Sequence, residues 1–137
     1  MKYSRSTVRV RGIRAICLGF AFCVLSLTLV NAQPSSSAEL IQNSRTYDGK
    51  VVVYAGEVIG DVMARGGYAW VNVYDGANAI GVWAPALLSS QITSRGSYKS
   101  RGDWVEVTGV FRRSCAQHGG DLDIHAQSLR KLSAGGR

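Results

Sequence analysis

The sequence lacks the motifs that mark common catalytic centres. Its 137 residues contain no H-E-x-x-H pair, no phosphate-binding loop and no nucleophile elbow, and no pair of carboxylates marks an evident pocket. Cys115 and His118 resemble a nucleophile and a base, but a spacing of two residues supplies no third group to orient the base. We therefore predict a protein that is not an enzyme.

Cysteine is scarce. Two of the three cysteines, Cys17 and Cys23, lie in an apolar N-terminal stretch, so Cys115 is the sole cysteine of the remaining chain. This excludes a framework of internal disulfides in that part. The thiol of Cys115 is then buried, bound to a metal or engaged in an intermolecular disulfide, and the sequence leaves these three roles open.

Acidic residues are missing from the first 32 residues, which hold five of the sixteen lysines and arginines. The eleven basic residues that follow exceed the nine acids by only two, so most of the formal charge of +7 belongs to the N-terminal segment. This excludes a histone-like polycation as the main feature. The remaining 105 residues suit one domain with a modest core and leave no room for a two-domain enzyme.

Residues 1–32 have the three parts of a secretory signal peptide. A basic region ends at Arg14, the uncharged apolar run 15–30 follows, and Val30-Asn31-Ala32 suits cleavage before Gln33. An uncleaved anchor is the alternative, although the run is shorter than the roughly 20 residues that span a bilayer. Either outcome predicts an exported domain, periplasmic or extracellular, that touches the membrane only through an uncleaved segment.

The rest of the chain predicts an all-β domain. Residues 33–46 form a polar linker and a short helix that Ser37 caps, and the period then changes to two in runs 50–59, 68–74, 79–83, 104–111 and 122–129. Hairpin turns fall at 64–67 and 75–78, and a helix at 85–91 separates the third strand from the fourth. This order predicts a five-stranded Greek-key barrel over residues 47–132, with a flexible tail at 133–137. The expected inward residues are Val53 or its neighbours, Val71, Val73, Ile80, Val82, Val105, Val107, Phe111, Leu122 and Ile124.

Three stretches carry a resemblance to a known superfamily. They are GEVIGDVM (56–63), YAWVNVYDGANAIGVW (68–83) and GDWVEVTGVF (102–111), the last followed by HGGDLDIHA (118–126). Over residues 50–132 the chain resembles the bacterial nucleic-acid-binding-like OB-fold domains related to anticodon-binding modules. The resemblance implies a five-stranded OB-type barrel that binds ligands on the outer face of strands two and three. OB folds bind single-stranded nucleic acid, oligosaccharides, peptides or proteins, so the fold does not specify the ligand.

Strand alternation places aromatic side chains on that outer face. Because Ala69, Val71 and Val73 share the core face, the opposite face of strands two and three carries Tyr68, Trp70, Tyr74 and Trp83. Aromatic rings on a strand surface stack bases and also sugars. The flanking loops carry three arginines that are candidate anion contacts, namely Arg65, Arg112 and Arg113, although neighbouring aspartates oppose them. The alternative is that several of the aromatics pack under the N-terminal helix.

A second group of residues has metal-ligating chemistry. Cys115 and His118 form a C-x2-H step, and His125 shares a strand face with Asp121 and Asp123. Thiolate and imidazole suit Zn²⁺ or Cu, but no second paired half-motif of the zinc-site type is evident, and Gly119-Gly120 more simply makes a turn. The alternative is a buried Cys115 with two hydrogen-bonding histidines.

The sequence thus predicts a non-catalytic OB-fold binding module. The expected ligand is single-stranded DNA, RNA or an oligonucleotide, held by the aromatic face and the arginines. An envelope module that binds a protein partner or a glycan, with a possible Zn or Cu site, is the competing prediction, because the exported part has little net charge.

Overall fold

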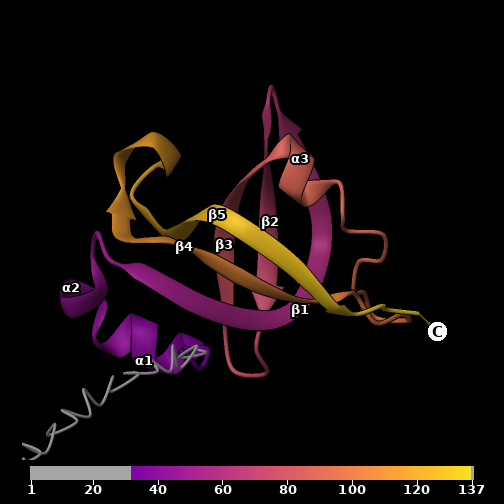
Figure 1. Ribbon diagram of the computed structural model, residues 1–137, viewed down its shortest axis with the longest axis horizontal. Helices are drawn as coiled ribbons and strands as arrows, with labels where there is room; N and C mark the ends of the chain where they lie inside the picture. The colour runs from indigo at the N-terminus through magenta and orange to yellow at the C-terminus, as the bar shows by residue number, and fades with distance from the viewer. Residues whose placement is uncertain (1–31, 137) are drawn as a thin grey trace, which may run out of the picture. The chain divides into compact units, whose positions relative to one another are not determined.

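The computed structural model describes residues 32–136, so the predicted export segment lies outside them apart from Ala32. Within this range the chain forms a closed barrel with the strand order β1-β2-β3-β5-β4 (Figure 1). Its strands are β1 (Val51–Arg65), β2 (Tyr68–Tyr74), β3 (Ala79–Pro85), β4 (Trp104–Cys115) and β5 (Asp121–Ser133). Helix α3 (Ala86–Ser89) lies between β3 and β4. The predicted five-stranded barrel with a helix after its third strand is confirmed.

The barrel core is built from the residues that alternation predicted. Eight of them are at most 1% exposed: Val71, Val73, Ile80, Val82, Val105, Val107, Phe111 and Ile124. Leu122 is only partly buried and packs against this core. In β1 the inward residues are the neighbours Val52 and Tyr54, and Val53 is half-buried. The Tyr54 hydroxyl donates a hydrogen bond to the Val73 carbonyl at 3.0 Å, and burial raises the pKa of that phenol.

Strand β1 is longer than predicted because it serves two neighbours. Its first half, Val51 to Glu57, pairs with β4, and its second half, Glu57 to Arg65, pairs with β2. A register shift between Ile59 and Met63 bends the strand between these two halves, and Gly60 adopts a φ of 67° there. Such a bend lets one strand pass from one side of a small barrel to the other.

Both ends of the described chain contact the barrel. Ser36, not Ser37, caps helix α1 (Ser37–Gln42), which helix α2 (Ser44–Tyr47) follows. The side chain of Leu40 is fully buried in the core cluster. At the other end, in what the sequence assigned to a flexible tail, β5 runs to Ser133 and Gly136 pairs with Arg101. None of the helices within residues 32–136 combines the length and the apolar character needed to cross a membrane.

Two aspartates form hydrogen bonds that hold the N-terminal and C-terminal segments against the barrel. Asp75 accepts hydrogen bonds from the Ser37 amide at 2.7 Å and the Ser37 hydroxyl at 2.8 Å. Burial by itself would raise the pKa of Asp75, but these bonds and two from backbone amides of its own turn lower that pKa to about 2. Asp103 is fully buried and accepts from the amides of Thr93, Ser94 and Gly135, which hold its pKa below the usual range against the effect of burial.

Candidate functional site

The aromatic residues of β2 and β3 meet on the outer face of the barrel. Trp70 lies directly opposite Trp83 in the β2–β3 register. The rings of Tyr68 and Trp83 are stacked, with centroids 5.2 Å apart and an interplanar angle of 3°. Tyr68 remains 45% exposed, while Trp70 and Trp83 are half-buried. The predicted grouping of these three side chains on one surface is therefore present in the structure.

A glycine makes room for the Trp70 ring. A Cβ atom placed on Gly81 of β3 would lie 2.0 Å from Cζ2 of Trp70, so the indole rests on the bare backbone of its neighbouring strand. The indole Nε1 donates a hydrogen bond to Asn72 Oδ1 at 3.2 Å. The absence of a side chain at Gly81 thus determines how Trp70 lies on the sheet.

The connection between β4 and β5 forms the other wall. It consists of the 3₁₀ helix η1 (Ala116–His118) and then Gly119 and Gly120, whose φ angles of 70° and 88° suit glycine. The turn carries the His118 ring back over the sheet, where its centroid lies 5.1 Å from that of Trp70 and 4.6 Å from that of Trp83. A histidine from a loop therefore completes the aromatic surface.

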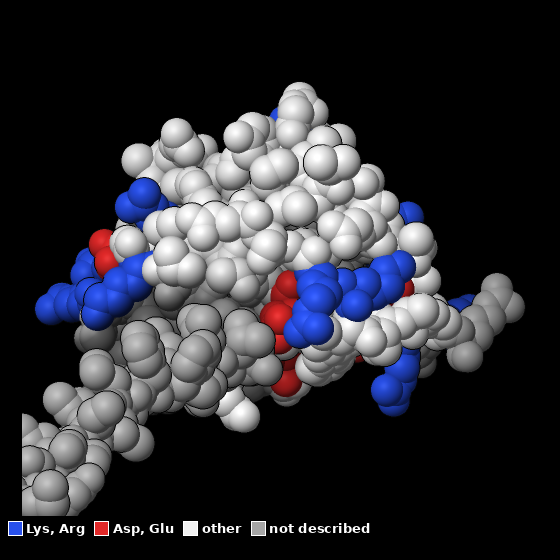
Figure 2. Space-filling model, in the orientation of Figure 1, with Lys and Arg blue, Asp and Glu red and all other residues white. Residues whose placement is uncertain are grey.

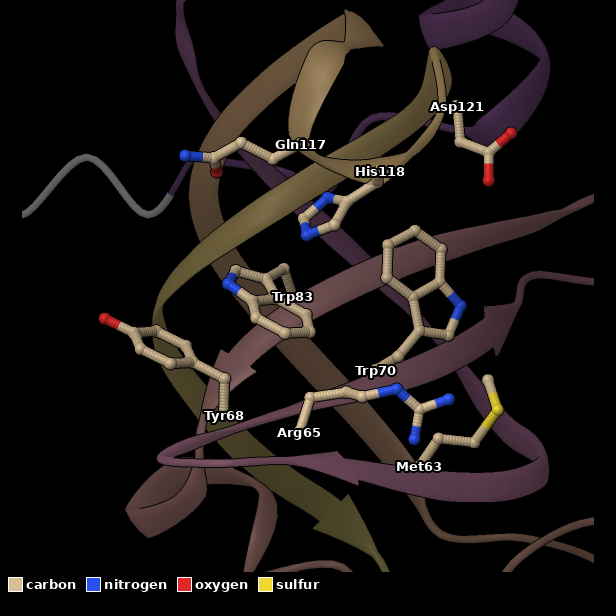
Figure 3. A pocket seen from close by; sticks show the side chains of 8 residues that line it. All are labelled: Met63, Arg65, Tyr68, Trp70, Trp83, Gln117, His118 and Asp121. Atoms are coloured by element: carbon tan, nitrogen blue, oxygen red, sulfur yellow. The ribbon is translucent and has the colours of Figure 1, made fainter.

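These walls enclose an open cleft of about 730 Å³ (Figure 3). Its lining contains five of the predicted ligand-binding and metal-binding residues, namely Arg65, Tyr68, Trp70, Trp83 and His118. Met63, Gln117 and Asp121 complete it and were not predicted as ligand contacts. Gln117 lies in η1, where side-chain direction does not follow the period of a strand, so the sequence offered no signal for it.

Three predicted ligand residues lie elsewhere. Tyr74 lines a different hollow beside Glu57 and Gly96, and its hydroxyl donates to the Gly76 carbonyl at 2.8 Å. Arg112 and Arg113 are exposed but do not line the cleft. The physical reason is that β4 continues to Cys115, so both arginines belong to the strand rather than to the loop that closes over the aromatic face.

Charge is mixed around the barrel. In the view of Figure 2 the basic side chains gather in separate places with acidic side chains beside them, and an uncharged area lies between. Two ion pairs of the barrel are Arg130 with Glu106 at 2.9 Å and Lys131 with Asp103 at 3.0 Å. In the cleft, Arg65 is the single lysine or arginine among the described lining residues, and Asp121 is the acid. The cleft is thus aromatic more than it is cationic.

His118 also belongs to a cluster of four side chains that carry metal-ligating groups. One donor atom from each of Cys115, His118, Asp123 and His125 lies within 4.8 Å of the other three. Cys115 Sγ and Asp123 Oδ1 each lie 3.4 Å from His125 Nε2, and His118 Nδ1 contacts Asp123 Oδ2. The structure therefore brings together the three predicted metal ligands and adds Asp123.

The cluster does not have the arrangement of a catalytic triad. In a triad the nucleophile contacts one ring nitrogen of the histidine and the carboxylate contacts the other. Here the sulfur of Cys115 and the carboxylate of Asp123 approach the same nitrogen of His125. The sulfur atom also belongs to a buried residue, 7% exposed.

Comparisons with known proteins identify the fold. No protein-family model and no curated protein sequence matches the chain. Among solved structures, asparaginyl-tRNA synthetase from Pyrococcus horikoshii aligns with a TM-score of 0.56 at 18% identity, over 74% of this chain and 23% of the synthetase. OBody AM3L15, bound to hen egg-white lysozyme, aligns with a TM-score of 0.56 at 18% identity, over 75% of this chain and 96% of the OBody.

These likenesses agree with the barrel order and with the helix after β3, so the domain has the OB fold. The chain spans about a quarter of the length of the synthetase that it matches. At such identities the likeness concerns the fold, and the ligand has to be argued from the cleft itself.

Proposed function

We propose that this OB-fold domain is a non-catalytic module that binds single-stranded nucleic acid in the cleft of β2, β3 and the β4–β5 connection. One observation carries the proposal. Three aromatic side chains, Tyr68, Trp70 and Trp83, lie with Arg65 around one open cleft on the face that OB folds use for ligands.

The cleft suits flat rings. The parallel rings of Tyr68 and Trp83 form a short stack, and an exposed Tyr68 at its end offers a platform for a base. Stacking of a base on an aromatic side chain contributes about 1–3 kcal/mol and tolerates any base. The volume of about 730 Å³ falls within the usual range of ligand pockets. We therefore expect binding with little sequence preference.

The electrostatic contribution is small. Arg65 Nη1 donates to the Ala64 carbonyl at 2.9 Å, which leaves further N–H groups of the guanidinium for a phosphate. For one phosphate contact to a single strand the logarithm of the affinity falls with the logarithm of salt concentration at a slope of about −0.7. If Arg112 and Arg113 also reached the strand, the slope would be about −2.

Tryptophan fluorescence tests the proposal. The protein has three tryptophans, and Trp70 and Trp83 line the cleft while Trp104 does not. Titration with oligothymidine at two salt concentrations should quench the emission of the two cleft tryptophans. An absence of quenching at millimolar oligonucleotide would refute nucleic-acid binding at this cleft.

Two tyrosines of β2 provide a matched pair of variants. Tyr68 lines the cleft and is 45% exposed, whereas Tyr74 lies outside it and is 37% exposed. Tyr68→Ala should weaken binding by about 5-fold to 150-fold, which corresponds to the stacking energy of one base. Tyr74→Ala should leave the affinity within about threefold, and an equal loss in both variants would place the ligand elsewhere.

A protein partner or a glycan is the second candidate. The mixed charge of the cleft favours it, and so does the OBody neighbour, which is a structure of similar fold bound to a protein. Binding of a glycan, which carries no phosphate, should respond little to salt. A sugar that protects Trp70 and Trp83 from a soluble quencher, under conditions where oligothymidine has no effect, would support this candidate.

We further propose that the domain is exported, because residues 1–32 read as a signal peptide or an anchor. N-terminal sequencing of the chain recovered from an extracytoplasmic fraction should begin at Gln33 if the segment is cleaved. A chain that begins at Met1 in the cytosol would contradict export.

A further inference from the structure

The cluster of Cys115, His118, Asp123 and His125 contains a buried carboxylate oxygen of Asp123 that accepts no hydrogen bond from the described residues. Asp123 is fully buried, and its Oδ1 has no hydrogen-bond partner among residues 32–136. That oxygen lies 3.4 Å from His125 Nε2, which lies equally close to Cys115 Sγ. A ring nitrogen carries at most one proton, so His125 Nε2 cannot donate to both neighbours. Buried carboxylate oxygens without a partner are rare because they lose hydration without compensation.

We propose that these four residues bind one Zn²⁺ ion. A cation among them would satisfy Asp123 Oδ1, Cys115 Sγ and His125 Nε2 together. With Zn–N and Zn–O distances of about 2.0–2.1 Å and a Zn–S distance of about 2.3 Å, the edges of a tetrahedral site measure roughly 3.3–3.6 Å. The two contacts of 3.4 Å have this length. The fourth donor, from His118, lies within 4.8 Å of the rest.

The chemical types of the four donor atoms favour Zn²⁺ over other divalent cations. One sulfur, two imidazole nitrogens and one carboxylate oxygen suit Zn²⁺, whereas Mg²⁺ and Ca²⁺ prefer oxygen ligands alone. The thiolate and the carboxylate together neutralise the two charges of the ion, which matters where Asp123 is fully buried. Cys115 binds as its thiolate and releases its proton to solvent. The His125 side chain is 28% exposed, compared with 13% for His118 and 0% for Asp123.

The ligands come in two local pairs, and the sequence analysis did not count the second pair as ligands of one site. Cys115 directly precedes η1 and His118 is the last residue of η1, so this single turn joins the two side chains over three positions. Asp123 and His125 are two residues apart on β5 and share one face of the strand. The D-x-H step of β5 is thus the second half-motif that a zinc site requires.

Occupancy of the site would act on the cleft. The His118 ring contacts both Trp70 and Trp83, so an ion bound to His118 would hold one wall of the cleft against the two tryptophans. This consequence does not depend on which ligand the cleft binds, so the zinc site and the nucleic-acid proposal can fail separately.

Metal content is the first test. The full chain carrying Cys17→Ser and Cys23→Ser, so that Cys115 is the remaining thiol, is purified without chelator and analysed by elemental mass spectrometry. We expect about one zinc per chain. Saturating Zn²⁺, at about 100 times its dissociation constant, should raise the melting temperature by about 10 °C relative to chelator-treated protein.

Two aspartates form the matched variants. Asp123→Asn should lower the zinc affinity by more than about 100-fold, because the loss even of an outer-shell partner costs about 10-fold to 100-fold. Asp121→Asn removes the same charge from an exposed cleft residue two positions away and should keep its zinc. Equal zinc content in both variants would overturn the assignment of Asp123.

A Co²⁺ titration of protein with all four ligands intact tests the site without relying on a variant that could fail to fold. Chelator-treated protein with an intact cluster should bind one equivalent of Co²⁺ with the visible spectrum of a tetrahedral site and a thiolate charge-transfer band, both abolished by Zn²⁺. Absence of this spectrum, together with a melting temperature that Zn²⁺ does not change, would refute the proposal. Stoichiometric copper in the purified protein, with intense visible absorption, would also overturn zinc as the resident ion.

Discussion

Replacement of Gly81 by alanine should displace the Trp70 ring from the sheet. The new Cβ would lie 2.0 Å from Trp70 Cζ2, and carbon atoms pack at about 3.5 Å, so the indole must move by about 1.5 Å. The displacement breaks the hydrogen bond from Trp70 Nε1 to Asn72 and disturbs the edge contact with His118. These two interactions contribute about 0.5–1.5 kcal/mol each.

The net loss of stability is smaller, because alanine in a strand is more favourable than glycine by about 0.5–1 kcal/mol. We therefore expect Gly81→Ala to lower the free energy of unfolding by about 0.5–2 kcal/mol. This corresponds to a melting temperature lower by roughly 2–10 °C in a domain of this size. If the cleft binds oligothymidine, the affinity should fall by about 5-fold to 150-fold, the contribution of one stacked base.

Gly67→Ala is the matched control. A Cβ at Gly67 meets no atom within 4 Å, and Gly67 does not have a positive φ, so this variant should be as stable as the parent or slightly more stable. Thermal unfolding and the near-ultraviolet circular dichroism of the tryptophans measure the two effects. If Gly81→Ala matched Gly67→Ala in stability and left the tryptophan signal unchanged, the close packing of Trp70 on Gly81 would be refuted.

Three further predictions concern the barrel. Val107→Asp should abolish cooperative unfolding, because it places an unpaired charge at a fully buried position and costs several kcal/mol of a total of about 5–15; a soluble, cooperatively folded variant would contradict the inward register of β4. Leu40→Ala should destabilise the domain by about 2–4 kcal/mol in urea denaturation, and a loss below about 0.5 kcal/mol would show that α1 does not contribute to the core. The pKa of Asp75, at about 2, is depressed from its ordinary value near 3.8, so its stabilisation is present above pH 4 and is lost as the pH falls towards 2. Asp75→Asn should therefore lower stability at pH 7 by about 1–2 kcal/mol after allowance for solvent screening, and the difference from the parent should shrink between pH 4 and pH 2; a difference independent of pH would exclude the hydrogen-bonded carboxylate as its cause.

Alternation along β2, β3 and β4 was sufficient to predict their part of the barrel core. In β2 and β3, Val71, Val73, Ile80 and Val82 are buried as their spacing required. The period of two is a local property of the extended backbone, so it needs no knowledge of the partner strand. The same local rule predicted that Tyr68, Trp70 and Trp83 share the opposite face, and it also placed Asp123 beside His125.

The length of a strand, in contrast, depends on its neighbours. β1 extends to Arg65 because β2 pairs with its second half, and β4 extends to Cys115 because β5 pairs with it as far as Asp121. Those pairings are formed between residues distant in sequence, which no local pattern records. The extension of β4 is what removes Arg112 and Arg113 from the cleft.

The sequence by itself thus determined the strands, the inward residues and the aromatic face, because each follows from the backbone period within one segment. Only the tertiary structure decided that η1 lays His118 on two tryptophans, that Gly81 lies under Trp70, and that Asp123 is buried among the donors of the β4–β5 connection. These contacts depend on how separate segments pack in three dimensions, and burial and hydrogen bonding of a side chain are set by that packing rather than by its neighbours in the chain.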